Sequence, residues 1–148
     1  MIEIRPIQPQ DRAAWTPLWR GYLAYYETEL PDEIYDSSFK RLTDPKVVPY
    51  HGFLAWEGDR ALGLVHYIFH MHGWKIEPVC YLQDLFTVPE TRGKGVGRAL
   101  IEAVYRAADE AGAPSVYWMT QAFNTAGRQL YDKVGELTPF IKYQRPSP

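Results

Sequence analysis

The residues best suited to chemistry lie in one stretch, 81–100, which reads YLQDLFTVPETRGKGVGRAL. Its first half is apolar and aromatic and predicts a buried strand that ends before Pro89. Gly93, Gly95 and Gly97 follow two residues apart, and they predict a turn whose backbone N–H groups can approach a bulky anion. A helix is predicted to begin near Gly95, with the positive end of its dipole at the same place. The stretch therefore predicts a pyrophosphate-binding cradle between a strand and a helix.

Three cationic side chains, Arg92, Lys94 and Arg98, surround this turn, which can be compared with three phosphate-binding patterns. The P-loop needs GxxxxGK followed by serine or threonine, and that string does not occur. The turn does not match the dinucleotide fingerprint GxGxxG, because the second glycine spacing is missing and that fingerprint would stand earlier in the chain. The pattern R/Q-x-x-G-x-G/A is filled by Arg92, Gly95 and Gly97. A surface turn whose glycines only start a helix is the structural alternative.

The third pattern is the acetyl-CoA signature of the GNAT superfamily of N-acetyltransferases, which this chain resembles. The resemblance implies acetyl-CoA as the cofactor. It assigns the pantetheine arm to Leu85, Phe86 and Thr87, where an extended amide chain can pair with a strand edge. A backbone N–H near Phe86 would polarise the thioester carbonyl. The pyrophosphate is assigned to the turn, with the predicted contacts Arg92, Gly93, Lys94, Gly95, Val96, Gly97 and Arg98.

A second part of the family pattern lies at residues 124–131, NTAGRQLY. It resembles the family string NxxAxxLY, with Gly127 where alanine or serine is usual. The resemblance implies that Asn124 binds the cofactor arm. Tyr131 follows two helical turns later and shares a face with Asn124. In the family this tyrosine protonates the departing thiolate, so Tyr131 is the predicted general acid. A core aromatic residue is the alternative, because the chain has 11 tyrosines.

The general base is not identified by the same comparison. Residues 81–86, YLQDLF, resemble the YLEDFF-type string of diamine and thialysine acetyltransferases, but Gln83 replaces their glutamate. An amide cannot accept a proton at neutral pH, so Gln83 is predicted to orient a water or the amine instead. Asp84 is the adjacent carboxylate, although neighbouring strand residues face opposite ways unless a bulge intervenes. We expect Asp84 to recognise substrate charge. Asp84 is also one candidate for the general base; the alternatives are an ordered-water relay and a substrate that arrives neutral.

A primary amine is the predicted acceptor. Residues 27–36 carry five acids and no basic side chain, which is either a solvated loop and helix start or a wall attractive to cations. Segments 15–26 and 63–69 also match the rhythm of the histone and polyamine acetyltransferase branch. The resemblance therefore favours a polyamine, a diamine, a lysine-like amine or a basic-protein amine. The predicted substrate residues are Tyr26, Glu27, Glu29, Trp74, Gln83 and Asp84.

The predicted elements follow the order βααβββαβαβ, which is the order of the GNAT fold. We expect one α/β domain over residues 1–148 with a mostly antiparallel mixed sheet. A βαβ crossover makes the strand predicted over 115–120 parallel to the strand that ends at Val88, and in the family this central pair splays apart. Pro17 predicts a kink or a late start in the first helix. A last strand is predicted over 137–143, and it could pair across a homodimer.

Composition limits the remaining function classes. A net charge of -2 disfavours nucleic-acid binding through phosphates, and no stretch has the apolar length of a membrane helix. His66 and His70 would lie about 13 Å apart along a strand, too far to share a metal ion. Cys80 is the single cysteine, so no internal disulfide can form and a reducing cytoplasm fits. Because of Gln83, a non-catalytic acyl-CoA-binding regulatory module is the main alternative to an enzyme.

Overall fold

The structure is a computed structural model that describes residues 1–47 and 49–148. It confirms the predicted order of the elements as far as the last helix, and α1 continues through Pro17 without interruption. The elements are β1 Ile2–Pro6, the 3-10 turn η1 Pro9–Asp11, α1 Arg12–Tyr25, α2 Asp32–Thr43, β2 Tyr50–Glu57, β3 Arg60–His70, β4 Val79–Thr87, the 3-10 turn η2 Pro89–Thr91, α3 Val96–Glu110, β5 Val116–Tyr117 and α4 Thr125–Val134.

The strands form one mixed sheet in the order β1-β2-β3-β4-β5. The first four strands pair antiparallel, in agreement with the mostly antiparallel sheet that the sequence predicts, and β5 is parallel to β4. The parallel pairing joins Cys80 to Val116 and Tyr81 to Tyr117, and α3 provides the crossover between the two strands. The sheet therefore has the predicted parallel pair, which is held together at one end only.

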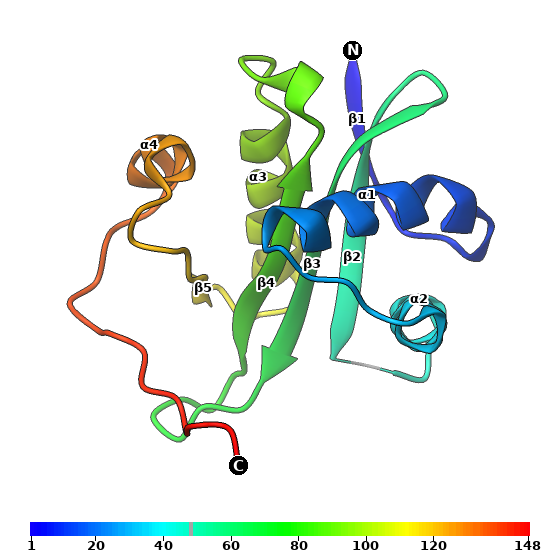
Figure 1. The fold of residues 1–148 in the computed structure, drawn as a ribbon. Coiled ribbons are helices and arrows are strands. Elements are labelled where there is room, and N and C mark those ends of the chain that lie inside the picture. Colours follow the sequence, from blue (N-terminus) through cyan, green and yellow to red (C-terminus); the bar gives the residue numbers. More distant parts are fainter. Residues whose placement is uncertain (48) are drawn as a thin grey trace.

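Two helices cover one face of the sheet (Figure 1). The apolar positions of α1 and α2 recur at helical spacing, so each helix has one buried stripe. Trp15 and Trp19 of α1 and Phe39 of α2 pack on Leu54 and Leu64 of the central strands. Trp15 is fully buried, and burial of an aromatic side chain of this kind stabilises the fold by about 2–3 kcal/mol. The side chains between these helices and the sheet therefore include a layer of aromatic rings.

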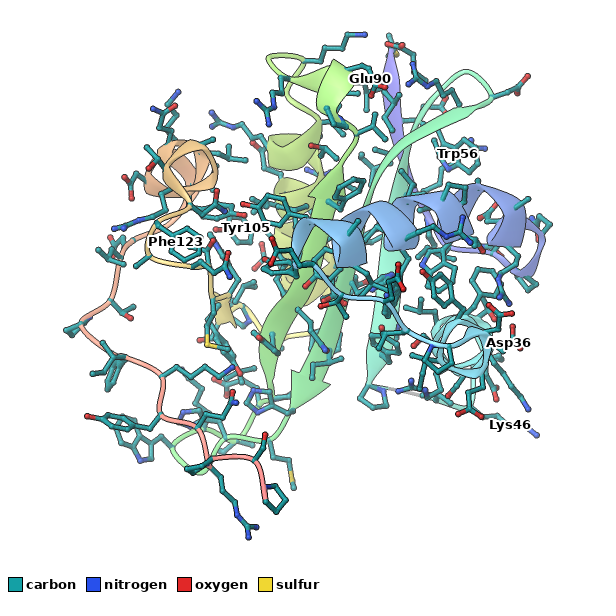
Figure 2. All side chains as sticks on the ribbon, viewed as in Figure 1. Asp36, Lys46, Trp56, Glu90, Tyr105 and Phe123 are labelled. Atoms are coloured by element: carbon teal, nitrogen blue, oxygen red, sulfur yellow. The ribbon has the colours of Figure 1, made fainter. Side chains whose placement is uncertain are left out.

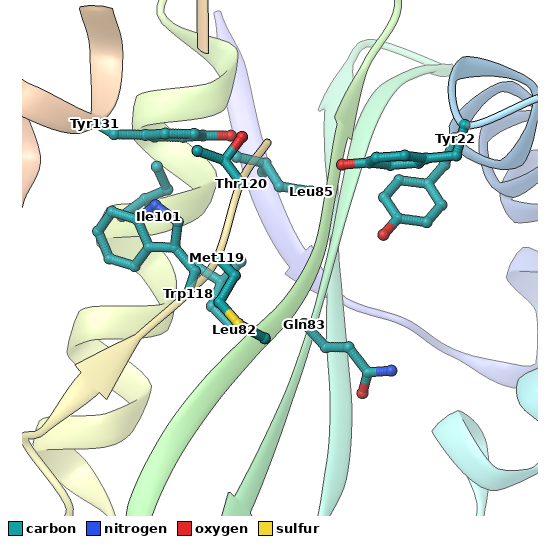
Figure 3. Close-up of a pocket in the computed structure, with 10 residues that line it drawn as sticks. Tyr22, Leu82, Gln83, Leu85, Ile101, Trp118, Met119, Thr120 and Tyr131 are labelled. Carbon is teal, nitrogen blue, oxygen red and sulfur yellow. The ribbon is translucent and has the colours of Figure 1, made fainter. Parts of the chain in front are cut away.

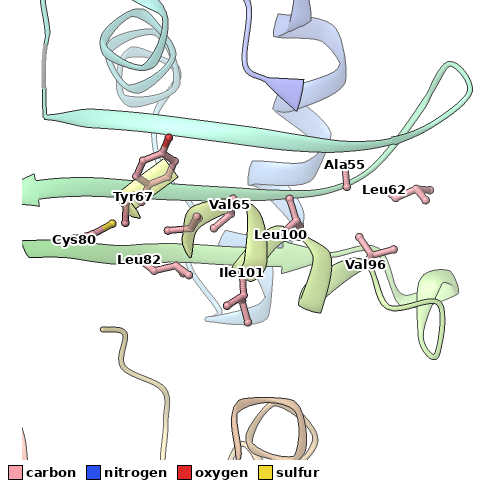
Figure 4. Close-up of a cluster of buried hydrophobic side chains, with 11 residues drawn as sticks. Ala55, Leu62, Val65, Tyr67, Cys80, Leu82, Val96, Leu100 and Ile101 are labelled. Carbon is pink, nitrogen blue, oxygen red and sulfur yellow. The ribbon is translucent and has the colours of Figure 1, made fainter. Parts of the chain in front are cut away.

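The opposite face is covered by α3. Its buried stripe includes Leu100, Ile101 and Val104, which pack on Val65 and Leu82 of β3 and β4. Figure 4 shows Leu100 and Ile101 of the helix beside Val65 and Leu82 of the strands. Since β4 is packed on both faces, its position is fixed by the two layers, and only its edge toward β5 remains open beyond the short parallel pairing.

The last helix, α4, is attached to α3 at the side of the sheet. The Tyr105 hydroxyl of α3 donates to the Val134 carbonyl oxygen at 2.6 Å, at the end of α4. Tyr105 lies between the strands and α4 in Figure 2. This attachment holds α4 across from β4, with the diverging chain after β5 between them (Figure 1).

Two strand predictions near the C-terminus are wrong. The strand predicted over 115–120 contains only Val116–Tyr117, and no strand forms over 137–143. The apolar residues of the second segment predicted a strand, but a strand requires a partner, and residues 136–148 stand away from the sheet (Figure 1). The tail leaves four large apolar side chains at least three-quarters exposed: Leu137, Phe140, Ile141 and Tyr143. Among the described residues, no helix has the length and apolarity that a membrane crossing requires.

Candidate active site

A cleft lies where β4 and β5 separate. It contains about 350 Å³ of space, part of which is open to solvent. Figure 3 shows Tyr131 of α4 on one side of this cleft and Tyr22 of α1 on the other, with β4 between them. Gln83 and Leu85 of β4 and Tyr26, just after α1, also line it. The predicted splay of the parallel pair thus brings two β4 residues, the end of α1 and α4 around one opening.

A β-bulge in β4 decides which way Gln83 and Asp84 face. His66 and Tyr67 are neighbours on β3, but their partners on β4 are Asp84 and Leu82, so Gln83 is the extra residue. Leu82 packs on the α3 face, and strict alternation would turn Asp84 to that face as well. The bulge instead pairs Asp84 with His66 on the α1 face, where Asp84 is 7% exposed, and it leaves Gln83 exposed at the cleft.

Asp84 is held by a hydrogen bond from β3, and the Tyr22 phenol of α1 lies close to it. His66 Nδ1 lies 2.9 Å from Asp84 Oδ2. The other ring nitrogen, His66 Nε2, lies 3.0 Å from Trp15 Nε1. Burial, followed by the negative charge of Asp84, raises the pKa of Tyr22 well above its ordinary value of 10.0. Tyr22 therefore keeps its proton at neutral pH and adds no charge beside the carboxylate.

None of His66, Trp15 and Tyr22 was predicted as a site residue from the sequence. The two α1 residues have the spacing of core positions and carry no further signal. His66 has one: it is the only histidine in the otherwise apolar run 61–69, ALGLVHYIF. A buried imidazole must find hydrogen-bond partners, so its strand position calls for a polar residue on a neighbouring element.

Tyr131 faces α1 across the cleft. Its ring packs edge-on against Trp118, with ring centroids 5.7 Å apart. Burial raises the pKa of Tyr131 above its ordinary value of 10.0, and the nearby phenols of Tyr26 and Tyr25 raise it further. The phenol is therefore protonated at neutral pH and is available as a hydrogen-bond or proton donor in the cleft.

The glycine turn beside the cleft has the backbone that the sequence predicts. Gly93 has a φ of 81° and Gly95 a φ of 77°, both in the left-handed region, and a Cβ at either would meet nothing within 4 Å. Gly97 differs, because a Cβ there would lie 3.2 Å from Leu130 Cδ2 of α4. Two glycines thus shape an open turn, and the third allows α3 and α4 to approach each other.

The cations of the turn are exposed. Lys94 Nζ lies 3.9 Å from Glu57 Oε1, and Arg98 Nε lies 2.6 Å from Glu102 Oε1. Exposed ion pairs of this kind contribute about 0–1 kcal/mol, so both side chains can turn toward a phosphate at little cost. Arg92 is exposed as well. With the N–H groups of the first turn of α3, which have no partner inside the helix, they make a surface whose charge suits an anion.

Asn124 caps α4. Its Oδ1 accepts from the Gly127 N–H at 3.1 Å, and its Nδ2 donates to Thr120 Oγ1 at 3.0 Å. A Cβ at position 127 would lie 2.5 Å from Asn124 Nδ2, so the folded-back cap explains glycine where the family pattern has alanine or serine. Asn124 therefore positions the helix that carries Tyr131, and its amide keeps one N–H that these two bonds do not use.

The remaining predicted cofactor residues sit on both sides of β4. Leu85 lines the cleft. Phe86 turns to the α1 face, where its ring takes the space that a Cβ of Gly21 would need, 2.6 Å from that position. Thr87 ends β4 and lies beside Gly97, with its Cγ2 3.9 Å from the place of a Cβ there. These residues connect the cleft to the glycine turn.

Three of the predicted substrate residues do not line the cleft. Glu27 and Glu29 are exposed in the connection between α1 and α2, and Glu27, just after α1, has a left-handed φ of 54°. Trp74 is 90% exposed in the loop between β3 and β4. By contrast, Tyr26 and Gln83 line the cleft, and Asp84 lies beside it. The residues that the structure brings together therefore come from α1 and β4.

Covalent chemistry by the single thiol has no support in the geometry. Cys80 is fully buried, and burial raises its pKa to about 11, so the thiolate that could act as nucleophile does not form at neutral pH. Within residues 1–47 and 49–148, no group of three or more histidine, cysteine or acidic side chains is placed to hold a metal ion.

Comparison with known proteins adds the family. The sequence model of the acetyltransferase (GNAT) family matches residues 14–135. The D-amino-acid N-acetyltransferase HPA3 of Saccharomyces cerevisiae is 42% identical over 147 residues, which cover 97% of this chain and 90% of that protein. The structure of AAC(6')-Iy in complex with the bisubstrate analogue CoA-S-monomethyl-acetylneamine has a TM-score of 0.86 at 20% identity, covering 100% and 99% of the two chains. A ribosomal-protein-alanine N-acetyltransferase from Brucella melitensis biovar Abortus 2308 has a TM-score of 0.80 at 18% identity, covering 99% and 100%.

The family match and the local geometry agree. The two solved structures share less than a quarter of their residues with this chain, so they show the fold alone. The family match covers most of the chain, and the open β4 edge with a glycine turn at its end fits an extended arm that carries a pyrophosphate. The chain therefore belongs to the acetyltransferase (GNAT) family and is an enzyme that takes its acetyl group from acetyl-CoA.

Proposed function

We propose that the protein transfers an acetyl group to a primary amine by direct attack, with both substrates bound together. The supporting observation is that a proton donor and a carboxylate lie on different sides of one cleft. A phenol that keeps its proton, Tyr131, stands on the α4 side, and a buried carboxylate, Asp84, stands beside the α1 side. Acetyl transfer needs a proton donor for the leaving thiolate and a negative environment for the amine, and the cleft separates the two.

In this proposal the glycine turn holds the pyrophosphate and the open edge of β4 holds the pantetheine arm. Acetyl-CoA supplies the acetyl group as a thioester. The backbone from Gly93 to Arg98 donates to the phosphate oxygens, and Arg92 adds charge. The backbone of Leu85, Phe86 and Thr87 pairs with the amides of the arm, and an N–H near Phe86 stabilises the oxyanion. Asn124 gives its remaining N–H to the arm.

Tyr131 then supplies the proton for the thiolate. An ordinary phenol has a pKa of about 10 and an ordinary thiol about 8.5, so the transfer is uphill by at least about 2 kcal/mol. This is small beside a chemical barrier, and the tyrosinate is transient because water returns the proton. The raised pKa of Tyr131 ensures that the proton is present when the thiolate forms.

On the other side, Asp84 attracts the ammonium form of the acceptor and Gln83 orients the amine or a water. Two routes lead to the neutral amine: proton loss to Asp84, or proton loss to a water held between Gln83 and Asp84. A substrate that arrives neutral would need neither. The three cases differ in the pH dependence of kcat/KM, because only the first two keep an ionisation of the enzyme in the acid limb.

For the acceptor we propose a small or side-chain primary amine. The sequence pattern favours the polyamine, diamine, lysine-like and basic-protein class, and the name of the yeast relative adds α-amino acids of D configuration. Buried Asp84 supports any amine that arrives as a cation, and the aromatic side chains of Tyr22 and Tyr26 can supplement its charge. The cytoplasmic location predicted from the single cysteine remains part of the proposal.

The test is thiol release from acetyl-CoA with a panel of acceptors. The panel holds spermidine, a diamine, lysine, a basic peptide, and the D and L forms of several amino acids. We expect release that saturates with at least one class, and the product identified by mass should carry one acetyl group on nitrogen. Saturable CoA binding without release for any acceptor would favour the acyl-CoA-binding regulatory module.

Replacing Gly95 by alanine should weaken CoA binding by about tenfold. A left-handed backbone costs an alanine about 1–2 kcal/mol, so the turn shifts and its N–H groups no longer point at the phosphates. A loss of about 1.4 kcal/mol corresponds to a factor of ten in affinity. Isothermal titration calorimetry with CoA measures the change. Gly112→Ala is the matched control, since Gly112 has a φ of 72° in open space at the other end of α3. Equal affinities in the two variants would remove the turn from the binding site.

We also propose that the chain forms a homodimer through the tail. Residues 137–143 have the composition of a strand, yet Phe140 is 85% and Tyr143 90% exposed, so a second copy is the partner that this apolar segment suits. Deletion of residues 137–148 should convert the dimer to a monomer in light scattering, whereas deletion of 144–148 alone should not. A full-length chain that stays monomeric at high concentration would contradict the proposal.

A further inference from the structure

The buried histidine behind Asp84 has no role in the reaction described so far. His66 is fully buried in β3, and its register partner across the bulge is Asp84. Its ring is packed between two indoles of α1, with centroids 6.1 Å from Trp15 and 5.3 Å from Trp19. A ring enclosed in this way cannot turn freely, so its hydrogen bonds are fixed by its neighbours.

The hydrogen-bond partners define the protonation of His66. An indole N–H is a donor only, so the 3.0 Å contact from Trp15 Nε1 requires a lone pair on His66 Nε2. The ring proton must then be on Nδ1, where it is donated to Asp84 Oδ2 at 2.9 Å. His66 is therefore the neutral Nδ1–H tautomer, and the short contact to Asp84 is a hydrogen bond between a neutral ring and a carboxylate.

The neutral state of the ring decides the charge that Asp84 presents. With a neutral His66, the pair has a net charge of −1; with an imidazolium, it would be neutral and would no longer attract an ammonium group. A carboxylate has about four acceptor sites, and the bond from His66 uses one of them. The others remain for the amine of a substrate.

We propose that His66 is a positioning residue for acetyl transfer and that the Trp15 indole, by occupying His66 Nε2, keeps the His66–Asp84 pair anionic for a cationic amine. This deepens the proposed function and rests on it for the substrate, whereas the tautomer itself can be tested without any activity. Among the described residues, the titratable groups beside the pair are Tyr22 of α1, close to Asp84, and Tyr50 of β2, whose hydroxyl lies 3.4 Å from His66 Nδ1, and neither carries a positive charge.

Two cations lie one residue further out. The Arg41 guanidinium of α2 sits 5.5 Å from the centre of the Tyr50 ring, and that of Arg12 sits 5.8 Å from the Trp15 ring. Each is separated from the imidazole by an aromatic side chain. Positive charge nearby disfavours an imidazolium, so both act in the same direction as the indole N–H.

The direct test is the nitrogen spectrum of the imidazole in the uniformly 15N-labelled protein. Long-range proton–nitrogen correlation distinguishes Nδ1–H, Nε2–H and imidazolium by the shifts of the two ring nitrogens. We expect the Nδ1–H pattern for His66 at the pH of the activity assay, because Trp15 occupies Nε2. An imidazolium or an Nε2–H pattern would overturn the inference, whatever the enzyme turns out to acetylate.

The kinetic test uses Trp15→Phe, which removes the indole N–H and leaves Nε2 free to take a proton. We compare the KM for the amine at about pH 8 and at about pH 6. In the variant this KM should rise on acidification by about tenfold more than it does in the wild type, because the His66–Asp84 pair loses its net charge. The KM for acetyl-CoA should not change, and Trp56→Phe, which changes an indole of β2 that packs under Arg5, should behave as wild type. A KM for the amine that changes with pH in parallel in both proteins would refute the proposal.

A second change guards against a merely structural effect. His66→Gln keeps a donor for Asp84 and an acceptor for Trp15 but cannot take a proton. In the Trp15→Phe, His66→Gln double variant, the amine KM should therefore lose its added pH dependence, because the group that titrates is gone. If the double variant keeps that dependence, the imidazole is not its source. Thermal unfolding of each variant shows whether the compared proteins are folded.

Discussion

Replacing Tyr131 by phenylalanine should lower kcat by about 100-fold or more while leaving the affinity for CoA within about twofold. A positioned general acid contributes about 10²–10⁴ in rate, and the phenol hydroxyl is the only part of the side chain that the change removes. The ring remains to pack on Trp118, so the wall of the cleft keeps its shape. Initial rates of thiol release and calorimetry with CoA measure the two quantities separately.

The control for this change is Tyr117→Phe. Tyr117 is a β5 residue whose hydroxyl bonds His70 Nε2 at 2.8 Å, and it does not line the cleft. Its loss should leave kcat within about twofold, as expected for a surface position. If the two variants have equal turnover, or if Tyr131→Phe loses CoA affinity in proportion to rate, Tyr131 is a binding residue and not the acid.

The pH dependence of kcat gives an independent check on Tyr131. A general acid must be protonated, so its contribution is lost as the pH rises through its pKa. Because burial and the phenols of Tyr26 and Tyr25 raise the pKa of Tyr131 above 10.0, that loss is moved to higher pH. The alkaline fall in kcat should therefore be centred above about pH 10, the ordinary phenol value. A fall centred near neutral pH would assign the acid to another group.

Replacing Asp84 by asparagine should lower kcat/KM for the amine by about 100-fold, with most of the effect in KM. Asparagine keeps the size and one acceptor for the His66 N–H but loses the negative charge. Removing one partner of a buried charged interaction costs about 2–5 kcal/mol, which spans roughly 30-fold to several thousandfold in binding. If kcat falls as strongly as KM rises, Asp84 also takes the proton of the amine.

The matched control is Asp36→Asn, which removes a carboxylate from α2 that pairs with Arg12 at 2.8 Å on the surface. It should change kcat/KM less than twofold, because exposed charges are screened by solvent. Glu29→Gln tests the acidic connection between α1 and α2 in the same assay. A large loss of kcat/KM in Glu29→Gln with none in Asp84→Asn would assign substrate recognition to the acidic residues of the segment 27–36.

The parts of the fold that could be predicted are those whose signals are local. The glycine turn follows from Gly93 and Gly95, whose left-handed backbone is a property of the residue type. The helix after Asn124 follows from spacing within one segment, and the mostly antiparallel sheet follows from the order of the predicted elements. The parallel pairing of β4 and β5 follows from the crossover rule, since α3 joins the two strands.

The parts that could not be predicted depend on contacts between distant segments. The bulge at Gln83 is set by its register with His66 and Tyr67, and it alone turns Asp84 to the α1 face. The bond from Trp15 to His66 spans 51 residues of sequence, and the spacing of α1 shows Trp15 only as a core position. The tail shows the converse: residues 137–143 have a strand composition but no partner in the described chain. Pattern thus identifies the elements, whereas register and partners place the site.

The most direct test of the account is a crystal structure of the protein with CoA bound. The account predicts a pantetheine arm that enters between β4 and β5 beyond Tyr81, a pyrophosphate on the turn from Gly93 to Arg98, and a sulfur within hydrogen-bond reach of the Tyr131 hydroxyl, on the side of the cleft away from Asp84. A bound CoA whose arm lies outside this opening, or whose sulfur points away from Tyr131, would contradict it.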